Sequence, residues 1–441
     1  MHIDTIRLHQ FRGAKKLTLK LDPQLNVFVG MNGSGKSTVL DASAILLSWM
    51  VNRMKSAKGS GRPINKPDIQ NGRPLSKLAI ECKQFAGQDP VRWGIVKSHY
   101  RVNNSEERTE LKALNTWVHE LQKTITGAEF KVNLPLFAYY PVNRAVLDIP
   151  LRIRGKHQFD LFSAYDGSLT GGANFRTFFE WFRDREDLEN ENLKLINGLL
   201  PTPQDCEHPD SQLEAVRTAI TQFMPDFSDL TVRRSPLRME IKKKGQVLTV
   251  DQLSDGEKCL MALVGDIARR LSICNAKSNT PLKGRGVIMI DEIDMHLHPK
   301  WQGMVVPKLT EVFPNCQFLI STHSPHVLTR VQPENIRLME IDGEEMRAHK
   351  VSESYGKTAN RILEDLMGLE STRPAEIEER LDELYDMIES GDLKKALDEI
   401  DDLRTEIGSD PELTKAAVLI KRKRSWANEA YNEASRATGI H

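Results

Sequence analysis

The stretch Gly30-Met-Asn-Gly-Ser-Gly-Lys-Ser-Thr38 decides the fold, because it matches the pattern of a loop that wraps a phosphate between a strand and a helix. An apolar run at residues 25–29 precedes it, and apolar residues at helical spacing follow it from residue 39. Glycines let the backbone curve around a phosphate and direct N–H groups at it, while the helix N-terminus adds partial positive charge. The sequence therefore predicts a phosphate site at this turn.

The side chains of this loop have separate predicted roles. Lys36 is expected to reach the β- and γ-phosphates of ATP, and the Ser37 hydroxyl is expected to coordinate Mg²⁺. A plain glycine turn would not need a lysine followed by a serine. The remaining predicted nucleotide contacts in the loop are Asn32, Gly33, Ser34, Gly35 and Thr38.

A second apolar strand, at residues 287–290, ends in two adjacent carboxylates, Asp291 and Glu292. In a phosphate-loop NTPase the first acid holds Mg²⁺, and the second is placed to orient and deprotonate the attacking water. Strands also end in ordinary acidic turns, so this signal gains its weight from the phosphate loop. We predict Asp291 as a metal ligand and Glu292 as the general base.

Two further motifs narrow the class. Ser254 can cap the helix that opens at Leu253-Ser-Asp-Gly-Glu-Lys258, but a plain capped helix does not explain why Gly256 stands two residues inside it. A buried strand at residues 318–322 ends in His323, which is placed to touch a γ-phosphate. His323, together with His296, His298 and His326, also suggests a metal site as an alternative, although an HxH turn is a weak signal.

These motifs occur in the order found in ABC-type ATPases of the SMC, RecF and OLD group, which the chain resembles over about residues 1–50 and 246–330. The opening Ile6-Arg-Leu-His-Gln-Phe-Arg-Gly13 also resembles that group, which implies that Arg12 contacts nucleotide. The stretch 295–302 is similar to a bacterial subgroup, the PtuA-like ATPases of Septu anti-phage systems, which also occur as retron effectors. The implied fold is an α/β ABC-type ATPase head with a helical insertion and a C-terminal helical region.

The resemblance implies how the site is completed. Two ATP molecules would be buried in a homodimer or higher homo-oligomer, with Ser254, Gly256 and Glu257 of one subunit meeting the nucleotide held by Lys36 of the other. Asp294 would lie at the seam, and His323 would sense the γ-phosphate. The family's glutamine loop has no clear counterpart, and Asn143 or Arg144 occupies its neighbourhood.

The same resemblance implies a function and partners. It implies an ATP-hydrolysing regulatory subunit of an anti-phage defence complex that controls a PtuB-like HNH nuclease and is not itself a nuclease. A retron reverse transcriptase with its RNA–DNA product is a further implied partner. Asp255, in place of a glycine, excludes a transporter. Three alternatives stay open: a RecF-like DNA-binding ATPase in repair, an ATPase sensor with a different effector, and a non-hydrolysing scaffold.

The amino-acid composition excludes several classes of protein. The 441 residues hold 61 Lys+Arg and 61 Asp+Glu, which excludes a protein that coats nucleic acid by bulk charge. No stretch approaches the roughly 20 apolar residues that span a bilayer, so no membrane contact is predicted. Five scattered cysteines without a CxxC pair favour a reducing cytoplasm over a disulfide framework.

The expected organisation is an ATPase head at residues 1–372 and a helical partner-docking region at 373–441. The head would carry a basic loop at 52–77, either solvated or in contact with phosphate, and a mixed α/β insertion at about 78–245. Residues 374–412 hold fifteen acids and four bases at helical spacing, and a basic cluster follows at 421–424. These charges could pair within the region or dock another protein.

Overall fold

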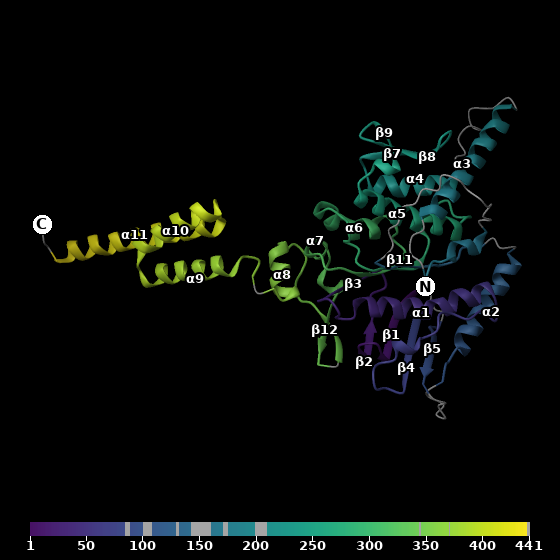
Figure 1. Cartoon of the computed structure of the whole chain (residues 1–441), viewed down its shortest axis with the longest axis horizontal. Helices are drawn as coiled ribbons and strands as arrows, with labels where there is room; N and C mark the ends of the chain where they lie inside the picture. The colour runs from purple at the N-terminus through teal and green to yellow at the C-terminus, as the bar shows by residue number, and fades with distance from the viewer. Residues whose placement is uncertain are drawn as a thin grey trace. The chain divides into compact units, whose positions relative to one another are not determined.

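The computed structural model describes residues 1–83, 89–99, 108–128, 132–142, 160–170, 175–198, 210–343, 345–369 and 371–438. They form two compact units, Met1–Ile362 and Leu363–His441 (Figure 1). Within the described ranges no helix is long and apolar enough to cross a bilayer.

A six-stranded sheet forms the centre of the first unit, in the order β13-β12-β3-β11-β10-β6. From β12 to β6 all neighbours are parallel, and only the edge strand β13 is antiparallel. Parallel strands end at one edge, so the turns that follow β3, β10 and β11 meet there. The strands are β3 (Leu25–Val29), β6 (Leu136–Tyr140), β10 (Gly286–Ile290), β11 (Cys316–Ser321), β12 (Ile336–Asp342) and β13 (Glu345–Lys350).

A second, antiparallel sheet has the order β2-β1-β4-β5. Its strands are β1 (His2–Phe11), β2 (Ala14–Lys20), β4 (Leu75–Lys83) and β5 (Val91–Ser98). Helix α1 (Lys36–Lys55) contacts β4 of this sheet and β6, β10 and β11 of the central sheet, so it lies between them (Figure 1). Its apolar residues are buried on nearly every side, as expected for a helix covered by two layers.

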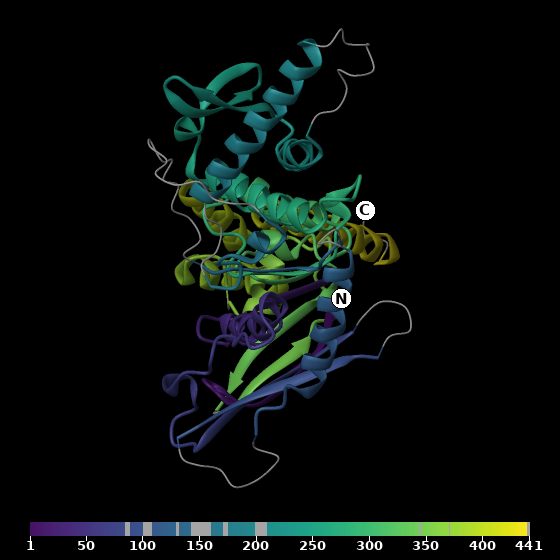
Figure 2. The ribbon, with the colours of Figure 1, turned by 90° about the vertical axis from the view of Figure 1, so that its right-hand side faces the viewer.

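The remaining helices surround these sheets, and a small antiparallel sheet, β7-β8-β9, lies beside α3 and α4 (Figure 2). Aromatic residues of α3, including Phe178 and Trp181, are buried, so the aromatic helix in the sequence serves packing. These elements are α2 (Lys112–Gly127), α3 (Phe175–Gly198), α4 (Ser211–Phe223), β7 (Phe227–Arg234), β8 (Leu237–Lys243), β9 (Gln246–Thr249), α5 (Asp255–Cys274), α6 (Pro299–Val312), α7 (Pro325–Leu328) and α8 (Ala359–Met367).

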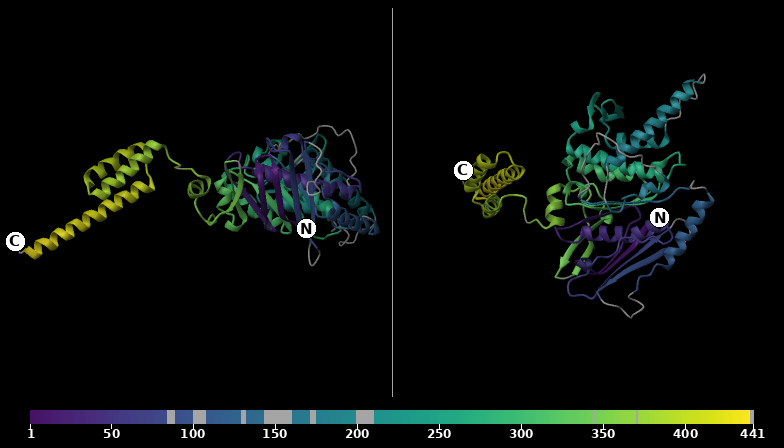
Figure 3. Two further views of the ribbon diagram at one scale, coloured as in Figure 1. Left: turned by 90° about the horizontal axis from the view of Figure 1, so that it is seen from below. Right: turned by 45° about the vertical axis from the view of Figure 1, so that its right-hand side comes forward.

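After the last residues of α8, the second unit contains α9 (Ala375–Ser390), α10 (Leu393–Ile407) and α11 (Pro411–Thr438), seen from two further sides in Figure 3. The apolar spacing in the sequence predicted this hairpin and the third helix, and the structure confirms them. Leu384, Leu403 and Leu413, one from each helix, are fully buried in its core.

Charge pairing in this unit begins within the acidic hairpin. Arg380 of α9 bonds Glu399 and Glu406 of α10. Lys423 of the basic cluster donates to the carbonyl oxygens of Ile388 and Glu389 at the end of α9, where the helix dipole favours a cation. Part of the opposite charge in the sequence is therefore used inside the unit.

The basic stretch 52–77 contains the last turn of α1 and a loop that is anchored at several points. The indole of Trp49 donates to the carbonyl oxygen of Arg62, and the Arg62 guanidinium contacts Asp41 of α1. Asp68 and Ile69 are buried. The loop thus packs on the head beside the helix that follows the phosphate loop.

Candidate functional site

The phosphate loop connects β3 to α1 through three glycines with positive φ. Gly35, at φ 97°, is the N-cap of α1, and Gly30 lies so close to the carbonyl of Met339 that a Cβ there would collide with it. Lys36 is buried, and its ammonium donates to the carbonyl oxygens of Gly30 and Met31 at 2.9 and 3.0 Å. The predicted loop is therefore folded with its lysine directed back into it.

The first carboxylate after β10 meets the phosphate loop directly. The Ser37 hydroxyl donates to Oδ1 of Asp291 at 3.1 Å, and Ser321 at the end of β11 also donates to Asp291. Asp291 is 2% exposed. A hydroxyl and a carboxylate are hard oxygen donors of the kind Mg²⁺ prefers, so the two side chains predicted as metal ligands lie together and suit that ion.

Glu292 and His323 lie in the same electrostatic environment. Glu292 has φ 47°, an uncommon conformation for a residue other than glycine, and its N–H donates to the Ser321 hydroxyl. Burial lowers the pKa of His323, and the nearby charge of Lys36 lowers it further, while the surrounding carboxylates oppose both. Burial also lowers the pKa of Lys36, although the nearby carboxylates act to raise it.

The turn after Glu292 is held to the end of β11. Oδ1 of Asp294 accepts from the Thr322 hydroxyl at 2.5 Å, and the Gln302 amide donates to the Asp294 carbonyl. Ser324 in turn donates to Gln302. Asp294, the predicted seam residue, is therefore held by Thr322 directly and by Ser324 through Gln302, and these two residues flank His323 in the chain.

The segment Leu253–Lys258, the signature segment of the ABC-type ATPases, opens α5 as predicted, with Ser254 as N-cap and a reciprocal capping box with Glu257. Lys243 of β8 bonds the other oxygen of Glu257 at 2.7 Å. A Cβ on Gly256 would lie 2.5 Å from the carbonyl oxygen of His296. This close approach to the turn after Asp294 explains the glycine that helix capping left unexplained.

Arg12 is engaged by carboxylates of its own chain. Its guanidinium bonds Asp41 at 2.5 Å and Asp68 at 2.9 Å, and Arg62 shares Asp41. Burial acts to lower the pKa of Arg12, but Asp41 and Asp68 raise it above the ordinary value. The nucleotide contact proposed for Arg12 would form within this network.

The central turns thus bring together Lys36, Ser37, Asp291, Glu292 and His323, while Ser254 and Gly256 stand at the start of α5. Asn32, Gly33 and Thr38 lie on the phosphate loop and its helix, and Ser34 has a buried hydroxyl with no hydrogen-bond partner in the described ranges. Asn143 and Arg144 lie outside the described residues.

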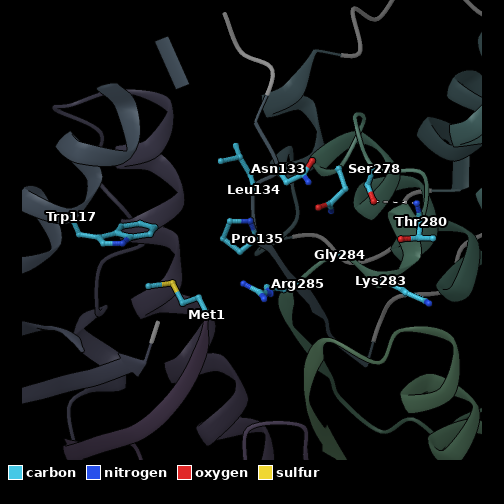
Figure 4. A pocket seen from close by; sticks show the side chains of 11 residues that line it. Met1, Trp117, Asn133, Leu134, Pro135, Ser278, Thr280, Lys283, Gly284 and Arg285 are labelled. Atoms are coloured by element: carbon cyan, nitrogen blue, oxygen red, sulfur yellow. Dashed lines mark hydrogen bonds between the residues drawn. The ribbon is translucent and has the colours of Figure 1, made fainter. Parts of the chain in front are cut away.

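Other features lie away from this site. A cavity of about 490 Å³ opens at the opposite edge of the central sheet, next to the starts of β6 and β10, with Trp117 at one end and Lys283 at the other (Figure 4). None of the predicted site residues lines it. In the described ranges, no group of three or more His, Cys, Asp or Glu side chains is arranged to hold a metal ion.

The sequence profile of the RecF/RecN/SMC N terminal domain matches residues 2–346. The chain belongs to this family. It is 30% identical to the Retron Ec83 probable ATPase of Escherichia coli over 429 residues, covering 85% of this chain and 78% of that protein. It is 29% identical to the Retron Vc95 probable ATPase of Vibrio cholerae serotype O1 biovar El Tor, covering 82% and 78%.

A third relative is the Septu protein PtuA of Bacillus mycoides, which is 29% identical over 397 residues. The match covers 87% of this chain but 46% of that protein. The resemblance stated from the motifs is therefore confirmed for the RecF/RecN/SMC family and for its retron and Septu relatives.

Sequence reasoning missed residues that support the site from a distance. Ser321, Asp41 and Arg62 each bond a predicted site residue or its partner, and Tyr140 accepts the N–H of Asp291 with its backbone carbonyl. Only the position of Ser321, two residues before the predicted histidine, gave a signal in the sequence. The other contacts depend on which elements become neighbours.

The lowered pKa of His323 predicts how stability depends on pH. Below the ordinary pKa of 6.5, the unfolded chain binds a proton that the folded chain resists, so the free energy of unfolding falls as pH decreases through 6.5. His323→Gln should reduce this fall, measured by urea unfolding between pH 5 and 8. The half-exposed His349→Gln serves as control; equal pH slopes in wild type and His323→Gln would contradict the prediction.

Proposed function

We propose that this protein is an ATP-binding and ATP-hydrolysing regulatory subunit of an anti-phage defence complex. In this proposal two copies enclose two MgATP molecules, and the nucleotide state controls a partner HNH nuclease. The observation that carries it is the junction of Ser37, Asp291 and Ser321, which joins the phosphate loop to the end of β10, the proposed catalytic strand that leads to Asp291 and Glu292. The names of the retron and Septu relatives support the defence role.

The chemistry assigns one task to each group. Lys36 and the N-terminus of α1 would bind the β- and γ-phosphates, because both offer positive charge at short range. Ser37 and Asp291 would hold Mg²⁺, which supplies neutralisation of phosphate charge when bound. Glu292 would accept a proton from the attacking water. His323 has a lowered pKa, so it would be neutral near pH 7 and able to donate one hydrogen bond to the γ-phosphate.

The second unit is the proposed docking region for the nuclease. Its own core and ion pairs hold its three helices together, while nine of its carboxylates are exposed: Glu376, Glu379, Asp382, Glu383, Asp386, Glu389, Asp398, Asp401 and Asp402. A chain ending at Arg373 that still co-purified with an HNH nuclease would remove this assignment.

The general-base role of Glu292 predicts a separation of binding from hydrolysis. Glu292→Gln keeps the shape and a hydrogen-bond acceptor but cannot take the proton, so phosphate release should fall roughly 100- to 10,000-fold. ATP affinity, measured by calorimetry, should stay within about threefold, since Lys36 and the loop are unchanged. Lys36→Ala should lose ATP binding itself. Equal near-zero rates of phosphate release in wild type and Glu292→Gln would favour a non-hydrolysing scaffold.

The proposal that each site is shared between two copies predicts complementation. Lys36→Ala and Ser254→Arg should each be inactive, because each spoils both sites of its homodimer. A mixture of the two variants places one intact Lys36 opposite one intact Ser254 in every heterodimer, so about a quarter of wild-type phosphate release should return. A mixture that stays inactive while light scattering shows mixed dimers would contradict the shared site. Lys36→Ala mixed with Glu292→Gln is the matched control and should stay inactive, because both substitutions fall on the same face.

A RecF-like DNA-binding role is the second candidate, and the outer face of the antiparallel sheet favours it. His9 stands directly opposite Lys16 on one neighbouring strand and Lys77 on the other, with exposed Arg7 two residues away. Arg7, Lys16 and Lys77 therefore bring positive charge to one face of this sheet, which would attract the phosphates of DNA.

Fluorescence anisotropy with duplex DNA tests this role. Tight, ATP-stimulated binding that weakens with salt is expected for a repair ATPase, and Arg7→Glu with Lys16→Glu should weaken it and reduce the salt slope. Lys394→Glu with Lys395→Glu is the charge-matched control on α10. Absence of binding would favour the regulatory subunit.

A further inference from the structure

A buried charge cluster outside the catalytic turns joins α5 to β6. Asp266, in the middle of α5, accepts from Arg269 at 2.7 Å and from Arg270 at 2.7 Å. It also accepts from the Tyr140 hydroxyl, at the end of β6, at 2.9 Å. All four side chains are at most 2% exposed.

This cluster is costly for a protein interior. Moving an ion from water into the core costs several kcal/mol, and apolar residues of similar volume are often as stable or more so. One carboxylate faces two guanidiniums, so the charges do not cancel. Arg270 relieves the excess by donating to the carbonyl oxygens of Ala164 and Asp166. Packing alone gives no reason for such a group, which calls for a role beyond filling space.

Tyr140 connects this cluster to the catalytic strand. Its backbone carbonyl accepts the N–H of Asp291 at 2.9 Å, while its side chain reaches Asp266. Burial raises the pKa of the Tyr140 phenol well above its ordinary value, and the Asp266 charge raises it further, so the hydroxyl keeps its proton and donates. Tyr140 therefore contacts both Asp291, the proposed Mg²⁺ ligand, and Asp266 in the middle of α5.

The N-terminal end of α5 carries the signature segment with Ser254. Ser254 caps the helix twelve positions before Asp266, about 18 Å along its axis, and the helix is continuous between them. The cluster also reaches the phosphate-loop helix, because Asp166, whose carbonyl binds Arg270, has a side chain that accepts from Lys55 of α1 at 2.6 Å. The helix that follows the phosphate loop and the helix that carries Ser254 are therefore both connected to this buried cluster.

We propose that Tyr140, Asp266 and Arg270 act as positioning residues that set the signature helix relative to the catalytic strand of the same chain. This inference rests on the proposed function. In the proposed dimer, the Ser254 end of α5 contacts nucleotide held by the partner, whereas Asp291 contacts the chain's own nucleotide. If the junction between α5 and β10 is rigid, ATP binding at one shared site also positions the residues of the other shared site. ATP therefore closes the dimer cooperatively.

Tyr140→Phe tests this role, because it removes one hydroxyl and keeps the ring. In a Glu292→Gln background, which separates the readout from hydrolysis, ATP binding by calorimetry should stay within about twofold. The ATP concentration that half-closes the dimer, followed by light scattering, should rise roughly 3- to 30-fold, with a lower Hill coefficient. In the otherwise wild-type chain, kcat should fall and KM should rise.

Tyr165→Phe is the matched control. Tyr165 is buried beside the same cluster, and its hydroxyl donates to the carbonyl oxygen of Pro135 at 2.7 Å rather than to α5. It should lower the melting temperature about as much as Tyr140→Phe while leaving dimer closure unchanged. Equal closure in Tyr140→Phe and its Glu292→Gln parent would overturn the positioning role alone. A parent that binds ATP but never dimerises would overturn the shared site and this inference together.

Discussion

The hydrogen bond between Ser37 and Asp291 is the contact on which the proposed chemistry depends. It joins the first turn of α1 to the end of β10, two segments that lie far apart in the sequence. The parallel order β3-β11-β10 makes it available, because it places the ends of β3 and β10 on either side of β11. Ser321, at the end of β11, then binds both Asp291 and the N–H of Glu292. One strand end therefore holds both the proposed metal ligand and the proposed general base with a single hydroxyl.

Local signals in the sequence were enough to predict the motifs and many of the elements. The glycine pattern of the phosphate loop, the apolar strand before Asp291, the Ser254 cap and the helical spacing after Arg373 each act within a few residues, where backbone preferences and side-chain periodicity decide the structure. Gly256 was different, since its reason is the carbonyl of His296, a residue forty positions later. A long-range contact of that kind requires a glycine, but the neighbouring sequence does not show why the glycine is needed.

The residues that sequence reasoning missed share a physical property. Asp41, Arg62 and Tyr140 act through partners brought near only by the packing of α1 and β6 against their neighbours. Arg12 shows the same effect, because family likeness assigned it to nucleotide while the fold also provides it with two carboxylates. A charged side chain with several candidate partners cannot be assigned from its own surroundings in the sequence.

A left-handed backbone and buried charge occur together at the turns that follow β3 and β10. Glu292 adopts a left-handed backbone, and Lys36 and Asp291 are buried. Such features persist only where the surrounding structure fixes them more strongly than their own cost. Here the turn at Asp291 is held by Ser321 at the end of the parallel strand β11. It is also held by Tyr140, which connects it to the Asp266 cluster. A head built in this way resists small deformations, so in the proposed closure around ATP α5 and β10 would move together as one rigid body. The buried junction at Tyr140 is the contact that would keep their relative position fixed during that movement.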